Sequence, residues 1–142
     1  MALAKRGCSV AVHYNSSKAK ADTVVSDLRT LGVNATAFQA DLSEYDNVQK
    51  LHADVVQQMG HPDILFNNSG ITNSVIGAQG DIESVSIEEY EKTWRVNAGS
   101  SYLVSGNHCW HGMAVQIYIE LTQLCIPHMV DKKFGRVVFC SR

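Results

Sequence analysis

The stretch Asp63-Ile64-Leu65-Phe66-Asn67-Asn68-Ser69-Gly70 decides the fold of this chain. Its first half is a short and nearly all-apolar run, which predicts a strand that is buried on both faces of a sheet. Its second half is made of Asn, Ser and Gly, residues that are typical of a loop. Strands buried on both faces belong to parallel sheets, and parallel strands need helical crossover connections. Helices and strands should therefore alternate on either side of this stretch.

The flanking sequence shows that alternation. Further strands are predicted at residues 8–14, 33–40 and 135–140. Helices are predicted after Ser16 or Ser17, after Ser43 and after Ser86, where a residue suited to an N-cap precedes apolar residues at helical spacing. This order predicts an α/β protein with a doubly wound parallel sheet.

The composition excludes several classes of function. Of the 142 residues, 45% are hydrophobic and 18% are charged, as in an ordinary soluble globular domain. The formal net charge is -2 and no long basic run occurs, so neither nucleic acid nor an anionic membrane is expected as a partner. The most apolar stretch, residues 113–126, is interrupted by polar side chains and is too short to span a bilayer.

The cysteines and histidines give no metal signature. The four cysteines show no CxxC spacing and lie in or beside apolar runs, which predicts reduced thiols and a cytoplasmic setting. The run His108-Cys109-Trp110-His111 supplies three ligands at most, and no second cluster lies near it in sequence. We therefore expect no metal site.

Four short motifs occur in order along the chain. Residues 63–70 look like the pattern D-x-L-V-N-N-A-G with Ser in place of Ala, and Asp41-Leu42 follows the predicted strand at 33–40. Arg95-Val96-Asn97 comes next, and the run from Gly135 to Ser141 looks like G-R-I-V-N-I-S. In these motifs the chain resembles the classical short-chain dehydrogenase/reductase family, and it is similar to 3-oxoacyl-(acyl-carrier-protein) reductase. The implied fold is a Rossmann-like doubly wound parallel sheet.

The resemblance implies a role for several of these residues. Gly70 has no Cβ, so the backbone can approach a nicotinamide cofactor closely. Asn68 would tie neighbouring strand ends and hold the ribose side of the cofactor, and Asp41 would accept a hydrogen bond from the adenine amino group. Asn97 would fix the backbone of its helix and an ordered water in a proton relay. The implied cofactor-binding residues are Asp41, Leu42, Asn68, Ser69, Gly70, Asn15 and Ser16, and the implied catalytic residue is Asn97.

Each of these residues also has a purely structural interpretation. The Asn-Ser-Gly loop alone would be an ordinary turn. Asp41 alone would be a helix-side cap or a solvated acid, and Asn97 alone a residue at a helix end. The order and spacing of the motifs favour the cofactor-binding interpretation over these alternatives.

The end of the predicted strand at 8–14 indicates which cofactor is preferred. In the resembling family an acidic residue at this point binds the ribose 2′-hydroxyl of NAD(H) and repels a 2′-phosphate. The stretch from His13 to Lys18, which includes Asn15 and Ser16, contains no carboxylate. The resemblance therefore implies NADP(H) rather than NAD(H).

The chain departs from the family pattern in three places. The opening strand and its glycine turn, G-x-x-x-G-x-G, which bind the pyrophosphate, are absent. The Tyr-x-x-x-Lys segment would follow the strand at 135–140, beyond the last residue, and Arg142 stands where the family carries its catalytic Ser. We therefore expect one incomplete domain over residues 1–142, lacking the first strand and the C-terminal half, with weakened cofactor binding and no catalysis. Because the missing strand would separate the strands at 8–14 and 63–67, two outcomes are open: these two strands pair directly in parallel, or the chain is not stably folded alone. We expect the structure to show the direct pairing and the isolated chain in solution to be unstable.

An atypical insert is predicted at residues 104–120. A continuous helix through this segment would be about 48 Å long, too long for one domain. Gly106, Asn107 and Gly112 disfavour helix within it. Its length keeps the reading frame, and Val104-Ser105 can be encoded by a splice-donor sequence, so we interpret it as a retained intron. A genuine insertion in the family is the alternative.

The resemblance implies hydride transfer between nicotinamide and a small carbonyl or alcohol substrate. Members of the family are usually homo-oligomers, and the insert puts that assembly in question for this chain. The alternative, from another class, is a non-catalytic chain that pairs with a full-length paralogue or another protein partner.

Overall fold

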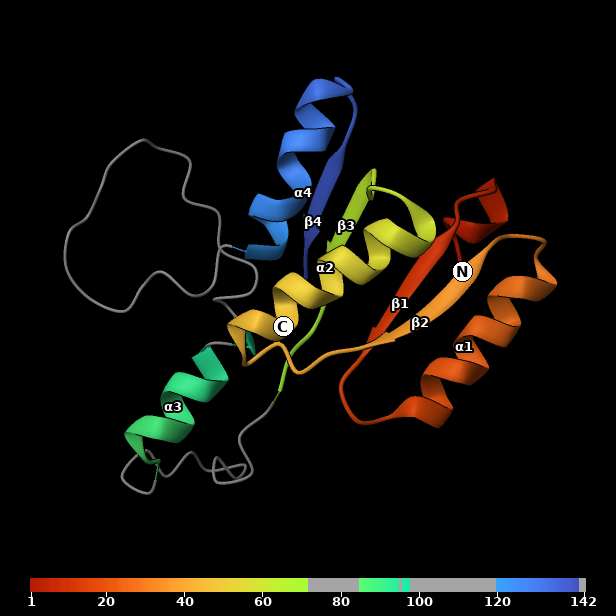
Figure 1. Cartoon of the computed structure of the whole chain (residues 1–142). Coiled ribbons are helices and arrows are strands. Elements are labelled where there is room, and N and C mark those ends of the chain that lie inside the picture. The colour runs from red at the N-terminus through yellow and green to blue at the C-terminus, as the bar shows by residue number, and fades with distance from the viewer. Residues whose placement is uncertain (72–84, 95, 98–119, 141–142) are drawn as a thin grey trace. The chain divides into compact units, whose positions relative to one another are not determined.

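The computed structural model describes residues 1–71, 85–94, 96–97 and 120–140 (Figure 1). The chain divides into two compact units, Met1–Pro62 and Asp63–Arg142, and each is described by itself. The predicted insert at 104–120 lies outside the described residues except for Glu120, where a helix begins.

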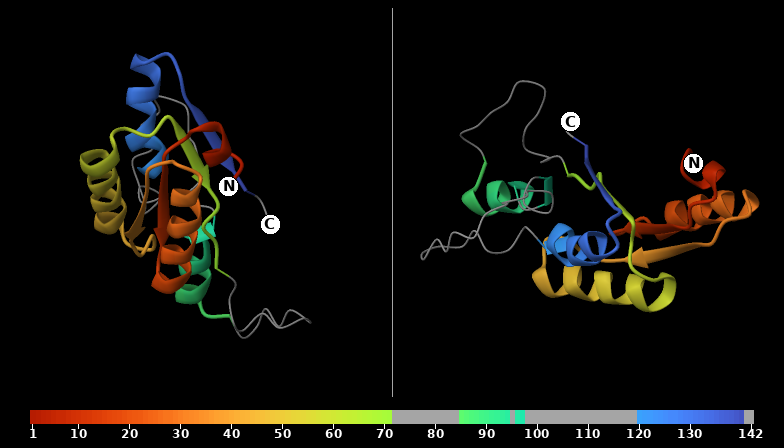
Figure 2. Two further views of the ribbon diagram at one scale, coloured as in Figure 1. Left: turned by 90° about the vertical axis from the view of Figure 1, so that its right-hand side faces the viewer. Right: turned by 90° about the horizontal axis from the view of Figure 1, so that it is seen from above.

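The first unit has a β-α-β-α order. Strand β1 (Val10–Tyr14) is followed by helix α1 (Lys18–Thr30), strand β2 (Ala35–Gln39) and helix α2 (Tyr45–Met59). The two strands pair in parallel along their whole length. Helix α1 packs on both strands and α2 packs on β2, and the arrangement can be followed in Figure 1 and Figure 2.

The core of the first unit forms where the apolar stripe of α1 meets the two strands. Val25 and Leu28 are buried against Ala35 of β2, and Leu28 is only 1% exposed. Ala4, from a 3₁₀ turn (Ala4–Arg6) that ends at Gly7 with a φ of 84°, completes the cluster. Burying a Leu side chain stabilises a fold by about 1.5–3 kcal/mol, so this small cluster is what holds α1 on the sheet.

The guanidinium of Arg29 covers part of the outer edge of β2. The Val10 N–H donates to the Asn34 carbonyl, so in a parallel ladder the polar groups of the next residue, Ala35, point away from β1. Arg29 donates to the Ala35 carbonyl from Nε at 3.0 Å and from Nη2 at 2.8 Å. A helical side chain thus satisfies a carbonyl that the sheet leaves unpaired.

The second unit contains a second parallel strand pair. Its described elements are β3 (Ile64–Asn67), helix α3 (Ile87–Trp94), helix α4 (Glu120–Asp131) and strand β4 (Arg136–Phe139). Strands β3 and β4 pair in parallel. The Cys140 N–H extends the ladder by donating to the Asn67 carbonyl at 2.9 Å.

Helix α4 buries one face, and an ion pair just beyond its last residue links it to the residue before β3. Thr122, Cys125 and Met129 are buried at spacings of one face of a helix. Burial raises the pKa of the Cys125 thiol to about 11, so this thiol stays protonated at neutral pH. Just beyond the helix, Lys132 Nζ lies 2.5 Å from the carboxylate of Asp63, the residue before β3.

The predicted α/β class with parallel strands is confirmed, but one predicted pairing is wrong. In the described residues β1 pairs with β2 and β3 pairs with β4, so the strands at 8–14 and 63–67 do not pair with each other. The pairing of β1 with β2 is a local one, because α1 connects these two strands and packs on both of them. The single domain over 1–142 stays a prediction.

No helix in the described ranges is both long and apolar enough to cross a bilayer.

The turn before β4 depends on Gly135. A Cβ added there would lie 2.5 Å from Cβ and Cγ of Met129, a distance that real Cβ contacts do not reach. Gly135→Ala should therefore push the turn away from α4 and lower the free energy of unfolding by about 1–3 kcal/mol. Urea denaturation would show the loss as a lower midpoint. The control is Val130→Ala on the exposed side of α4, expected within about 0.5 kcal/mol of the wild type. Equal midpoints for the two variants would contradict the prediction.

Candidate functional site

The carboxyl ends of β1 and β2 lie at one edge of the first unit's sheet because the strands are parallel. Strand β1 ends at Tyr14 and its partner ends at Gln39, two residues in register with each other. In α/β proteins, ligands bind outside the carboxyl ends of parallel strands. The structure brings together at this edge four of the predicted cofactor-binding residues, Asn15, Ser16, Asp41 and Leu42.

Asp41 forms a tight turn just after β2. Its Oδ1 accepts hydrogen bonds from the Ser43 backbone N–H at 2.9 Å and from the Ser43 hydroxyl at 2.7 Å. Such a turn fixes the direction of the carboxylate. The prediction that Ser43 caps the second helix is wrong, because its hydroxyl donates to Asp41 and α2 begins at Tyr45, with Glu44 at the N-cap.

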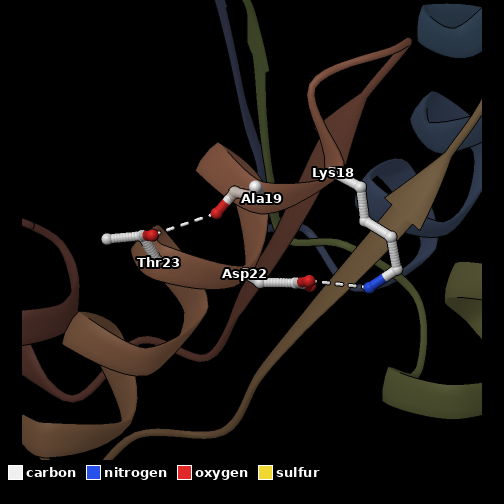
Figure 3. A network of polar contacts seen from close by, with 4 residues as sticks. All are labelled: Lys18, Ala19, Asp22 and Thr23. Atoms are coloured by element: carbon white, nitrogen blue, oxygen red, sulfur yellow. Dashed lines mark hydrogen bonds and ion pairs between the residues drawn. The ribbon is translucent and has the colours of Figure 1, made fainter.

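The connection from β1 to α1 is exposed and carries no carboxylate. The Asn15 carbonyl accepts from the Gln39 side chain at 3.2 Å, and the Ser16 carbonyl accepts from the Lys18 N–H at 3.1 Å. The Lys18 ammonium donates to the Asp22 carboxylate at 2.6 Å, one turn along α1 (Figure 3). This hydrogen bond raises the pKa of Lys18, so the residue is a stable cation next to the strand end.

The loop after β3 follows a buried Asn. Asn67 is 8% exposed, and its amide nitrogen makes a long hydrogen bond of 3.5 Å to the Thr122 hydroxyl of α4. Asn68 and Gly70 are exposed and Ser69 is half-buried. The sequence interpretation gave Asn68 the task of tying strand ends, whereas the side-chain link described here starts at Asn67. The sequence did contain a signal for the role of Asn67, because this residue is polar and stands at the last position of an otherwise apolar strand.

Asn97 holds the backbone of Ile71 with both ends of its amide. Its Oδ1 accepts from the Ile71 N–H at 2.6 Å, and its Nδ2 donates to the Ile71 carbonyl at 2.7 Å. A side-chain amide offers an acceptor and a donor side by side, so it can pair with both the backbone N–H and the backbone C=O of one residue. This contact, called the Asn97 clamp below, fixes the end of the loop at residues 68–71. Ile71 was not among the predicted residues.

Gly70 is required by the Asn97 clamp. A Cβ at this position would lie 3.3 Å from Oδ1 of Asn97, closer than an ordinary van der Waals contact. The sequence interpretation attributed this glycine to the close approach of a cofactor. The structure adds a reason inside the protein, since a side chain here would press on the amide that holds Ile71.

These two groups of residues present hydrogen-bonding groups in fixed positions, as a ligand-binding site requires. At the ends of β1 and β2 stand an oriented carboxylate and exposed polar groups, and after β3 stands a loop held in one conformation by the Asn97 clamp. Among the described residues, no group of three or more His, Cys, Asp or Glu side chains could hold a metal ion. His108, Cys109 and His111 lie outside the described ranges, as do Ser141 and Arg142.

Comparison with protein families gives a match over nearly the whole chain. The family described as short chain dehydrogenase matches residues 1–141. Among curated proteins, versicolorin reductase 1 of Aspergillus parasiticus is 33% identical over 105 residues, which is 74% of this chain and 38% of that protein. An uncharacterized oxidoreductase of Methylorubrum extorquens is 43% identical over 135 residues, which is 89% of this chain and 50% of that protein.

Solved structures of similar proteins agree with the observed fold. A variant of a Serratia marcescens short-chain dehydrogenase/reductase superposes with a TM-score of 0.71 at 26% identity, covering 96% of this chain and 46% of that one. A putative dehydrogenase from Burkholderia cenocepacia with bound NADP superposes with a TM-score of 0.60 at 35% identity, covering 68% and 36%. These neighbours have the Rossmann-like fold that the sequence predicted.

The chain spans 38% and 50% of the length of these two curated relatives, and 37% of a hydroxynaphthalene reductase-like protein to which it is also similar. The family match covers the motifs at residues 41–42, 63–70, 95–97 and 135–141, and the reductase relatives and solved neighbours agree with that family. This chain belongs to the short-chain dehydrogenase family.

Proposed function

We propose that this chain carries the nucleotide-binding part of an NADP(H)-dependent oxidoreductase that exchanges hydride between nicotinamide and a small carbonyl or alcohol compound. The observation that carries the proposal is the Asn97 clamp, which gives the loop at residues 68–71 a defined conformation. Two further findings support it. A relative is named as a reductase, and a solved neighbour is named with bound NADP.

The proposed roles come from the resemblance, and the contacts within each strand-end group support them separately. Bound NADP(H) supplies the hydride. Asp41, oriented by Ser43, accepts from the adenine amino group beside Leu42. The loop of Asn68, Ser69 and Gly70 receives the ribose on the nicotinamide side. Asn97 acts through the backbone that it holds, and we assign it the catalytic role that the resemblance implies.

The proposed preference for the phosphorylated cofactor rests on the connection between β1 and α1. Asn15 and Ser16 can donate to a 2′-phosphate, and no carboxylate of this segment repels it. Lys18 adds a positive charge nearby, although Asp22 partly neutralises it.

We expect NADPH to bind to the 142-residue chain about tenfold more tightly than NADH. Titration calorimetry at millimolar ligand would measure the ratio. Asn15→Asp, which has nearly the same shape, places a carboxylate at the strand end and should reverse the preference. Tighter binding of NADH by the wild type would contradict the proposal.

The substrate, the cellular location and the oligomeric state are also proposals. The similarity to 3-oxoacyl-(acyl-carrier-protein) reductase stays a prediction, since the relatives include versicolorin and hydroxynaphthalene reductases. The free thiols of Cys8, Cys125 and Cys140 support a cytoplasmic setting, where thiols are kept reduced. Homo-oligomer formation also stays a prediction.

A second candidate function is a non-catalytic chain that pairs with a full-length paralogue. The observation that favours it is that each described strand pairs along only one edge. Unpaired edges are templates for strands of another chain. Sedimentation of the chain mixed with a full-length paralogue would test it, because a stable complex is expected and two independent species would contradict it.

A further inference from the structure

His13 joins β1 to the residue that precedes Asp41. It lies opposite Phe38 of β2, and its Nε2 is 2.9 Å from the carbonyl oxygen of Ala40. The N–H of Ala40 donates to the Tyr14 carbonyl at 3.0 Å. Two consecutive residues of β1 thus hold both polar groups of Ala40, a residue that is 3% exposed.

The hydrogen-bonding partner determines which nitrogen of the imidazole carries a proton. A carbonyl oxygen only accepts hydrogen bonds, so Nε2 must carry the proton. A phenyl ring has no such donor, whereas the amide of a glutamine can supply one.

The position of this contact in the chain gives it a consequence for Asp41. The Ala40 carbonyl belongs to the peptide group that leads into Asp41, so fixing it fixes the backbone on which the Asp41 carboxylate stands. On the other side, Ser43 holds the carboxylate itself with two hydrogen bonds. His13 therefore holds the backbone carbonyl that precedes Asp41, and Ser43 holds the Asp41 carboxylate.

We propose that His13 is a positioning residue for the adenine end of the cofactor site. It touches Ala40 rather than the ligand, and through that carbonyl it sets the direction in which Asp41 meets the 6-amino group of adenine. The inference rests on the proposed function, because it takes Asp41 as the acceptor for that amino group. It adds a residue of β1 whose task is selection of the base.

The test compares two nucleotides that differ only in the group that faces Asp41. Adenosine 5′-monophosphate carries an amino group at position 6, and purine riboside 5′-monophosphate carries only a hydrogen there. The full 142-residue chain should bind the adenine nucleotide about tenfold more tightly, as expected for one charge-assisted hydrogen bond. His13→Phe should reduce this ratio to about one, and His13→Gln, which keeps a donor, should retain most of it.

The outcomes separate the inference from the proposed function. If the wild type binds neither nucleotide, or binds both equally, the proposed adenine site is wrong and the inference falls with it. If the wild type discriminates and His13→Phe discriminates equally well, only the role of His13 is overturned. Because a phenyl ring could disturb the strand, His13→Asn, whose amide is too short to reach Ala40, is a second arm. A general loss of structure would weaken both nucleotides alike, so the ratio is the deciding quantity.

Discussion

The purified 142-residue chain should show no NADPH-dependent carbonyl reduction above the rate without protein. The residue assigned a catalytic role within these 142 residues is Asn97, whose amide is not a general acid, and Arg142 stands where the resembling family has a catalytic Ser. General acid catalysis alone is typically worth about 10²–10⁴-fold, and a positioned cofactor contributes more. A spectrophotometric assay of NADPH oxidation with a panel of small ketones and quinones would measure the rate.

A matched variant distinguishes true turnover from contamination. Asn97→Ala removes the clamp on Ile71 and with it the one catalytic residue assigned in this chain. Turnover that persists in this variant would come from another protein in the preparation. Turnover that depends on Asn97 would show that the chain catalyses the reaction, and the prediction would be wrong.

Asn97→Ala should also release the loop at residues 68–71. The substitution removes two hydrogen bonds, at 2.6 and 2.7 Å, that hold the Ile71 peptide. At about 1 kcal/mol each, their loss should speed amide exchange at Ile71 roughly 30-fold. Hydrogen exchange followed by NMR would measure the rate at this single amide. An unchanged rate would mean that the clamp contributes nothing to the conformation of the loop.

Asn97→Asp is the informative control for that measurement. Its carboxylate can still accept from the Ile71 N–H, but it places a second oxygen against the Ile71 carbonyl and donates nothing. Exchange at Ile71 should therefore fall between the wild type and Asn97→Ala. Gly70→Ala should act in the same direction as Asn97→Ala, because its Cβ would press on Oδ1 of Asn97.

The sequence predicts the order of helices and strands because apolar periodicity reports burial directly. The spacing of Val25 and Leu28 predicts the face of α1 that the structure buries, and the apolar run at 63–67 predicts the position of β3. The prediction that this strand is buried on both faces is wrong for the described residues, because Phe66 is 55% exposed. Which strands pair is not a local property. The order along the chain does not say whether β1 and β3 pair across a missing strand, and the structure assigns them to different pairs.

The candidate site is less predictable than the fold. The motif placed Asp41 correctly after a strand, but its contact with Ser43 was missed, although an Asp two residues before a Ser is a common turn pattern. The link from Asn67 and the contact from His13 to Ala40 were also missed. Such contacts join residues that are far apart in sequence, so no spacing along the chain reveals them.

The contact between Arg29 and Ala35 also bears on how the chain behaves at high concentration. Strand β2 ends its two-stranded sheet, and an open strand edge is where one molecule can stack onto another and begin to aggregate. An incoming strand would have to displace two donors of a guanidinium before its own N–H could reach the Ala35 carbonyl. The displaced guanidinium of Arg29 would also stay near the strand edge, where it would repel the Arg29 guanidinium of a second molecule. The placement of Arg29 is therefore that of a gatekeeper residue, and we expect its removal to make this edge more prone to intermolecular pairing.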